Sequence, residues 1–215
     1  LAALGCAHSA ADSTDFAGGR HERSRRAHNG DVTNAFLYFA GHRLSIAELT
    51  AARLDGDVVD VGDAWMPSDA VETTEIRAAS LRLLAPDALT VSLVSAAWVH
   101  GAVNDPPARL TLCRTENARL HHVFDRRIVV HDRGVDRVDR RRYGGVGVTT
   151  PARTLADLAR ADDEHVRGVT ATLARLHPYA IPEALQWFAA RGRMPHRRRA
   201  TAQLERLAEA LLTTR

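Results

Sequence analysis

The sequence predicts an α+β protein, with a truncated N-terminal winged helix-turn-helix and a C-terminal α/β domain whose small sheet is backed by helices. Two observations carry this prediction. In residues 31–67, two helical repeats are followed by a short alternating stretch. In residues 144–160, GGVGVTTPARTLADLAR, a short β-branched run leads into a helix. Thr150 can cap that helix, and Pro151 suits its first turn because a missing N–H costs nothing there.

Length and composition bound the class of protein. With 215 residues, 45% of them hydrophobic, the chain can bury a substantial core and is long enough for two small domains. We divide it into a flexible leader (1–30), a winged-helix-like segment (31–70), a linker helix (71–87) and a C-terminal domain (88–215). No apolar run approaches the ~20 residues that span a bilayer, and residues 1–30 lack the apolar stretch of a signal peptide. We therefore expect a cytoplasmic protein with no membrane partner. Its 2 cysteines exclude a disulfide framework.

Charge is distributed unevenly along the chain. All 29 residues counted as Lys or Arg are arginine, which excludes the lysine of a phosphate-binding loop, of a Schiff base or of a PD-(D/E)xK nuclease. Residues 31–90 hold 4 arginines against 10 acidic residues, whereas residues 91–215 hold 21 against 13. A polyanion would therefore be attracted mainly by the C-terminal part.

The N-terminal elements are predicted in the order helix, turn, helix, hairpin. Apolar residues recur at helical spacing from residue 32 to residue 40, followed by Gly41. A second helix over 45–54 begins with a capping box of Ser45 and Glu48, and Ile46, Leu49 and Leu54 form its apolar stripe. Residues 57–67, DVVDVGDAWMP, alternate as a hairpin or wing. The same spacing also fits a small helical hairpin with a β-ribbon.

As a recognition helix, segment 45–54 would place Ser45, Thr50 and Arg53 where they could read bases. Arg43 and Arg53 are its cations. Four aspartates in or beside this segment would be repelled by phosphate: Asp55, Asp57, Asp60 and Asp63. Fold analogy and charge thus point to different regions as the DNA contact.

The remaining elements are predicted from the spacing of apolar residues and from residues that begin or end helices. We predict a linker helix over 73–83, ended by Pro86, and over 89–94 either a buried strand or the entrance to the next helix. A helix over 95–102 would be capped by Ser95 and anchored by Trp98. Further strands are predicted over 109–114, 122–131 and 144–150, and helices over 151–160, 163–176, 182–190 and 195–212.

Two motifs in this C-terminal part match a known family. One is a Ser-Ala-Ala-x-x-x-Gly helix start, and the other reads T-T-P-x-R-T-L-x-D. The matching residues are Ser95, Ala96, Ala97 and Gly101 in the first, and Thr149, Thr150, Pro151, Arg153, Thr154, Leu155 and Asp157 in the second. On these residues the chain resembles the AbiEi-type antitoxins of type IV toxin–antitoxin systems, in the form of actinobacterial transcriptional regulators. The resemblance extends from residue 31 to the C-terminus.

The resemblance implies sequence-specific binding of double-stranded DNA at the protein's own promoter, with autorepression. It also implies opposition to a nucleotidyltransferase-like toxin. We expect a transcriptional regulator that is not an enzyme and uses no cofactor; homo-oligomerisation stays open. Two alternatives remain: a degenerate nuclease-like domain that processes nucleic acid, and an antitoxin whose acidic first domain binds a basic toxin without specific DNA readout.

Two arginine clusters are the candidate phosphate contacts of the C-terminal domain: Arg140, Arg141 and Arg142, and Arg197, Arg198 and Arg199. The second cluster opens the last predicted helix, where each cation opposes the helix dipole at a cost of a few tenths to about 1 kcal/mol. A bound phosphate would relieve that cost, although a solvated face fits the pattern equally well.

Other reactive residues are given structural roles. Arg153 and Asp157, four apart on one helix, are expected to pair and to orient neighbouring loops. His100 is expected to be a core histidine, because no nucleophile lies at a catalytic spacing from it. The spacing of four further residues matches no closed zinc pattern, so no metal site is predicted: Cys113, His121, His122 and His131.

Overall fold

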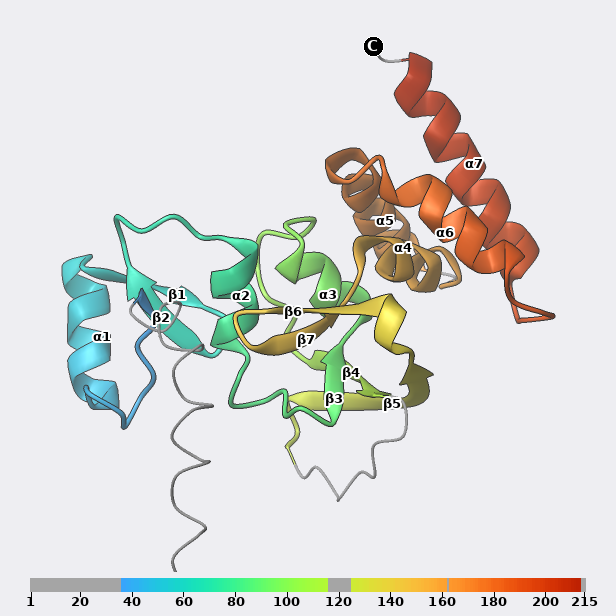
Figure 1. The fold of residues 1–215 in the computed structure, drawn as a ribbon. Coiled ribbons are helices and arrows are strands. Elements are labelled where there is room, and N and C mark those ends of the chain that lie inside the picture. The colour runs from blue at the N-terminus through green and yellow to red at the C-terminus, as the bar shows by residue number, and fades with distance from the viewer. Residues whose placement is uncertain (1–35, 116–124, 162, 214–215) are drawn as a thin grey trace, which may run out of the picture.

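The protein contains both helices and strands in a computed structural model that describes residues 36–115, 125–161 and 163–213 (Figure 1). The α+β class is therefore confirmed. In order, the elements are α1 (Ile46–Asp55), β1 (Val58–Val61), β2 (Ala64–Pro67), α2 (Thr74–Ser80), β3 (Leu89–Val91), α3 (Leu93–Val99), β4 (Leu110–Thr115), β5 (Ile128–Val135), the 3₁₀ turn η2 (Arg137–Asp139), β6 (Arg140–Tyr143), β7 (Val146–Thr149), α4 (Pro151–Ala159), α5 (Glu164–Leu176), α6 (Ala180–Ala189) and α7 (Arg197–Thr213).

The predicted second helix and the hairpin after it form as α1 and β1–β2, but these two elements alone do not confirm a winged helix-turn-helix. The Ser45 hydroxyl accepts a hydrogen bond from the Glu48 N–H, and the Glu48 carboxylate accepts one from the Ser45 N–H at 2.7 Å, so the capping box is complete. Gly56 ends the helix with a φ of 85°, a left-handed conformation that glycine adopts without strain. The predicted apolar stripe is wrong in part: Leu49 is buried, whereas Ile46 and Leu54 are 57% and 80% exposed.

The helix predicted before α1 is not formed in its described part, residues 36–41; residues 31–35 lie outside the described ranges. Tyr38 instead exchanges two backbone hydrogen bonds with Trp65, of 2.8 and 2.9 Å, and adds an extended segment to the hairpin. Leu37 and Phe39 are buried on either side of the less buried Tyr38, which is the two-residue alternation of a strand. The sequence prediction assigned a helical period to a segment that is extended.

A five-stranded mixed sheet in the order β5-β4-β3-β7-β6 forms the centre of the molecule. Strands β3 and β7 are parallel, as are β4 and β5, while β3–β4 and β6–β7 are antiparallel. Strand β6 was not predicted, because its arginine run has no apolar alternation. The strand predicted for 122–131 begins only at Ile128, and residues 122–124 fall outside the described ranges.

Helices α2 and α3 are packed against this sheet (Figure 1). The linker helix is thus present as α2, capped by Thr73. Its buried residues, among them Ile76 and Ala79, join one hydrophobic cluster that also includes Val61 and Met66 of the hairpin and Leu112 of the sheet. The hairpin and the sheet therefore share a core through α2.

Helix α3 lies between two cores. Trp98 and Val99 belong to the hairpin–sheet cluster, whereas Ala97 belongs to a second cluster built by α4 to α7. The predicted cap is wrong: α3 begins after Ser92, and Ser95 lies inside the helix, where its hydroxyl accepts a hydrogen bond from the Thr111 N–H at 2.8 Å.

The C-terminal helices surround α4. Thr150 caps α4 by accepting a hydrogen bond from the Arg153 N–H, Pro151 is its first residue as predicted, and all its residues are buried. Helix α7 packs on this core through Ala200 and Leu204. Among the described helices, none has both the length and the apolar character needed to cross a bilayer.

Candidate nucleic-acid interface

An open, arginine-rich groove of about 1080 Å³ lies at the start of α7. It is lined by Arg193, Met194, Pro195, His196, Arg197, Arg198, Arg199, Thr201, Ala202 and Glu205. Four of these side chains are cationic guanidinium groups and one is a carboxylate. The α7 groove therefore presents a net positive charge beside a helix N-terminus, an arrangement that attracts anions.

Two of the arginines predicted to contact phosphate in this groove already donate hydrogen bonds to backbone carbonyl groups. Arg197 donates to the Arg191 carbonyl just beyond α6 at 2.8 Å, and Arg199 donates to the Arg160 carbonyl at the end of α4 at 3.0 Å. Helix C-termini carry partial negative charge and unpaired carbonyl groups. The cost predicted for cations at the start of α7 is thus offset by the ends of two other helices.

The remaining two arginines are differently placed. Arg193 and Arg198 are exposed, and neither makes a hydrogen bond or ion pair with any other described residue. A guanidinium without an internal partner keeps its donors for a phosphate. Arg198 was among the predicted contacts, whereas Arg193 was not.

The second predicted cluster forms strand β6, at an edge of the sheet. Arg142 makes an ion pair with Asp87 at 2.8 Å and also donates to the Gly145 carbonyl. Arg141 is exposed and lines a hollow of about 240 Å³ with Tyr143 and Tyr179, while Arg140 is half-buried. The alternation of a strand sends neighbouring side chains to opposite faces, so these arginines do not form one patch.

The predicted contacts on α1 are largely engaged within the protein. Ser45 is used in the capping box, and the Thr50 hydroxyl donates to the Ile46 carbonyl at 2.7 Å. Arg53 makes a 2.6 Å ion pair with Asp60 of the hairpin. Arg43 is exposed and lines a hollow that contains a second cation, Arg82.

Figure 1 shows these three predicted regions well apart: α1 at one end, β6 in the central sheet, and α7 beyond the other C-terminal helices. The structure therefore does not bring Arg43 and Arg53 together with Arg198. A short DNA segment would contact one of these regions at a time unless it followed the length of the molecule.

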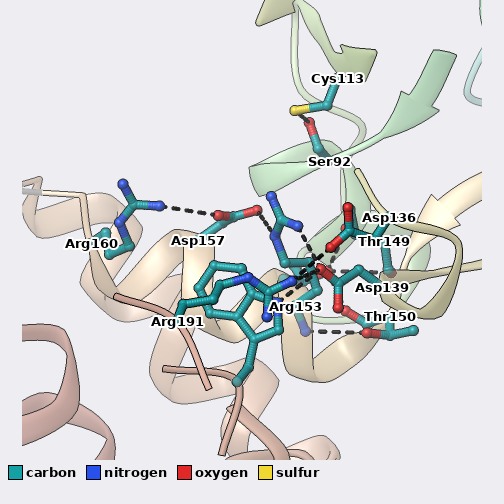
Figure 2. A network of polar contacts seen from close by, with 12 residues as sticks. Ser92, Cys113, Asp136, Asp139, Thr149, Thr150, Arg153, Asp157, Arg160 and Arg191 are labelled. Atoms are coloured by element: carbon teal, nitrogen blue, oxygen red, sulfur yellow. Dashed lines mark hydrogen bonds and ion pairs between the residues drawn. The ribbon is translucent and has the colours of Figure 1, made fainter. Parts of the chain in front are cut away.

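A network of charged side chains, buried at its centre, joins η2, α4 and the residues after α6 (Figure 2). Arg153 donates through Nε to Asp157 and through Nη1 to Asp139, both at 2.8 Å, and all three side chains are less than 10% exposed. Burial alone would lower the pKa of Arg153, but the two carboxylates outweigh it and raise that pKa. The Arg153–Asp157 pair was predicted; Asp139 was not.

Asp139 connects the sheet side of the network to α6. Its Oδ2 accepts hydrogen bonds from Arg153, from Trp187 Nε1 at 2.8 Å and from Arg191 at 2.9 Å. The Arg191 guanidinium lies 3.9 Å from the centre of the Trp187 ring and also pairs with Asp136. The i,i+4 spacing of Trp187 and Arg191 is the sequence signal that could have found this contact.

His100 is buried, as expected, at the junction of the sheet and the C-terminal helices. Its Nε2 lies 2.7 Å from the Thr149 carbonyl, so this nitrogen carries the proton of a neutral ring. Burial lowers the pKa of His100 to about 4, against the hydrogen bond to Thr149, and neighbouring His177 adds to the lowering. The ring packs edge-on against Tyr143 and His177.

Cys113 and His131 are paired across β4 and β5, but no group of three or more metal-binding side chains occurs among the residues that the structure describes. His121 and His122 lie outside those residues. The Cys113 thiol is buried and donates to the Ser92 hydroxyl at 3.2 Å, and burial raises its pKa, so it is not an activated nucleophile.

Comparisons with known proteins assign no family. No family model and no curated protein matches the sequence. Among solved structures, the chain is similar to the RV2827C protein from Mycobacterium tuberculosis, with a TM-score of 0.40 and 16% identity over 81% of this chain and 71% of that one. A similarity this distant supports no statement about function.

Proposed function

We propose that this protein is a cytoplasmic DNA-binding transcriptional regulator of the AbiEi-like antitoxin type, which represses its own promoter. The observation that carries the proposal is the α7 groove, in which Arg193 and Arg198 face solvent without a partner among the described residues. Phosphate contacts from such cations position a protein on DNA and supply most of its salt-dependent affinity.

Base readout is assigned to α1, in keeping with the resemblance to a winged helix. Its contribution to affinity is expected to be small. Arg53 is already neutralised by Asp60, and Asp55 and Asp57 follow directly at the end of the helix. Affinity and specificity therefore come from opposite ends of the molecule.

The first test is a gel-shift assay with the protein's own upstream DNA and an unrelated competitor of equal length. We expect preference for the upstream fragment at physiological salt. Equal competition by the unrelated DNA would eliminate sequence-specific repression and leave only charge-driven binding.

The second test measures the salt dependence of binding in an R193A/R198A double variant. The slope of log affinity against log salt should fall by about 2, one for each lost phosphate contact. The matched control is R126A/R137A, which removes two arginines that are exposed outside the groove. In this control the slope of log affinity against log salt should stay close to that of the wild type. Equal slopes for the two variants would remove the α7 groove from the proposal.

A second function is favoured by the surface of α1. Ile46 and Leu54 expose 57% and 80% of their area beside the acidic hairpin, which suits a basic protein surface better than a phosphate backbone. The partner would be the nucleotidyltransferase-like toxin that the family resemblance implies. Co-purification with such a protein encoded by the adjacent gene, lost in an I46R/L54R variant, would support this role. Binding by that variant at wild-type strength would contradict it.

A further inference from the structure

A hollow of about 270 Å³ lies between the extended segment and turn that precede α1 and the residues just after α2. Its lining includes apolar and basic residues: Leu37, Phe39, His42, Arg43, Leu44 and Arg82. No carboxylate occurs among the described residues of this Arg82 pocket, whereas the α7 groove includes Glu205. The positive charge of the pocket is therefore not compensated by its own walls.

Arg82 is positioned by an aromatic ring and by no acceptor. Its guanidinium carbon lies 4.1 Å from the centre of the ring of Phe39, which is itself buried. A cation–π contact positions the charge without occupying a hydrogen-bond acceptor. The guanidinium makes no hydrogen bond or ion pair with another described residue. None of its nitrogens is among the buried unpaired atoms of that part of the chain, so its donors are accessible to a ligand.

The second cation, Arg43, lies on the turn before α1. It is exposed and makes no hydrogen bond or ion pair within the described ranges. The turn has a defined geometry, because the Gly41 N–H donates to the Leu44 carbonyl at 3.0 Å and the His42 N–H to the Phe39 carbonyl at 3.2 Å. The His42 ring lies 6.1 Å from the Phe39 ring and adds a further polar group to the wall.

These walls favour a small anion that also has an apolar part. Two cations on one hollow repel each other, and a doubly charged phosphate would neutralise both. Guanidinium groups bind phosphate oxygens through paired N–H donors. Leu37, Phe39 and Leu44 offer apolar surface to an organic group, and the volume lies just below the usual range of small-molecule sites, roughly 300–1,000 Å³. A DNA backbone would bring the phosphate but leave the apolar wall without a partner.

We propose that the Arg82 pocket binds a small organic phosphate, whose charged head contacts Arg43 and Arg82 and whose apolar body lies against Leu37 and Leu44. The site is independent of the α7 groove and of the DNA-binding proposal. Because the pocket joins the turn before α1 to the residues after α2, an occupant would hold the start of α1 against α2.

The test uses phenyl phosphate as the probe and isothermal titration calorimetry as the measurement. It is made in the R193A/R198A variant, so that the α7 groove contributes little to phosphate binding. We expect saturable binding of one phenyl phosphate per chain, about tenfold tighter than phenol, which lacks the charged head, and than inorganic phosphate, which lacks the ring. No saturable binding of phenyl phosphate would overturn the proposal, as would equal affinity for either of the other two probes.

Two further variants in this background locate the site. Arg82→Met keeps an unbranched side chain over Phe39 and removes the charge, and Arg43→Gln removes the second charge from an exposed position where folding should be unaffected. Each should weaken phenyl phosphate about tenfold and leave phenol binding within roughly twofold. The matched control, Arg137→Gln, changes an exposed arginine of η2 and should bind phenyl phosphate unchanged. Full affinity in Arg43→Gln would overturn the assignment, whether or not Arg82→Met folds.

A DNA backbone phosphate is the other source of the same chemistry, and competition separates the two. A short unrelated duplex, added to the R193A/R198A variant at a phosphate concentration equal to that of the probe, should leave phenyl phosphate bound. Displacement of phenyl phosphate by the duplex would assign the Arg82 pocket to DNA and overturn its assignment to a small molecule.

Discussion

Two groups of arginines in the C-terminal half differ in what surrounds them. Arg153 and Arg191 meet Asp136, Asp139 and Asp157 in a network that is buried at its centre. The arginines of the α7 groove meet helix-end carbonyl groups or solvent.

The difference shows why an arginine count overstates a DNA-binding surface. Residues 91–215 carry 21 arginines, but those paired with carboxylates inside the fold add nothing to the charge that DNA would meet. Within the α7 groove the distinction recurs, because Arg197 supports a helix end while Arg198 faces outward.

The largest effect is expected for Arg153→Ala. Removing one partner of a buried ion pair leaves uncompensated carboxylates, so the free energy of unfolding should fall by about 3–5 kcal/mol. Urea denaturation followed by circular dichroism measures this. The control is Arg137→Ala, an exposed arginine in η2, which should change stability by less than about 0.5 kcal/mol. Similar losses for the two variants would show that the network is not stabilising.

His100 provides the opposite case, a buried basic group with a carbonyl but no carboxylate. Its pKa of about 4 lies below the ordinary value of 6.5, so between these values the unfolded chain binds the extra proton. Above pH 6.5 His100 is neutral in both the folded and the unfolded chain, and its titration costs no stability. As the pH falls from 6.5 towards 4, the free energy of unfolding should decrease by about 3 kcal/mol in all.

A His100→Gln variant isolates this effect, because glutamine can donate to the Thr149 carbonyl but does not titrate. Comparing urea denaturation at pH 7 and pH 4.5, we expect the wild type to lose more stability than the variant. Parallel losses in the two proteins would mean that His100 is protonated in the folded state without penalty.

A smaller effect separates two neighbours in the α7 groove. Arg197→Ala removes a charge-assisted hydrogen bond to the end of α6 and should lower the free energy of unfolding by about 1 kcal/mol. Arg198→Ala should leave stability unchanged while weakening DNA binding. Equal stability of the two variants would contradict the assigned division of roles.

The smallest effect is expected on α1. A T50A/R53A variant should change affinity for unrelated DNA less than twofold at physiological salt, because Arg53 is compensated by Asp60. Fluorescence anisotropy with a labelled duplex measures this. A loss as large as that of R193A/R198A would move the phosphate contact to the N-terminal end.

The sequence was most informative where a local rule decides the structure. The capping box at Ser45, the Thr150–Pro151 start of α4 and the Arg153–Asp157 spacing all depend on residues within four positions of one another, and all three are confirmed. The hydrophobic period of 36–41 was misassigned because the pairing of Tyr38 with Trp65 is a long-range contact that spacing does not reveal.

The candidate site was less predictable than the fold. Which arginines are exposed depends on where distant helices end: Arg197 and Arg199 find carbonyl groups 6 and 39 residues away in the chain. The Asp139 contact to Trp187 spans 48 residues. Such partners are set by packing, and the one-dimensional pattern contains no direct signal for them.

The three donors on Asp139 Oδ2 also determine how far the chain can be shortened. One of them, Trp187, lies near the end of α6 and another, Arg191, just beyond it, while the acceptor belongs to the turn beside the sheet. A chain ended after α5 would lose these donors and expose the apolar face that Phe188 covers. Any fragment that keeps the C-terminal core and all three donors on Asp139 must therefore extend at least through residue 191.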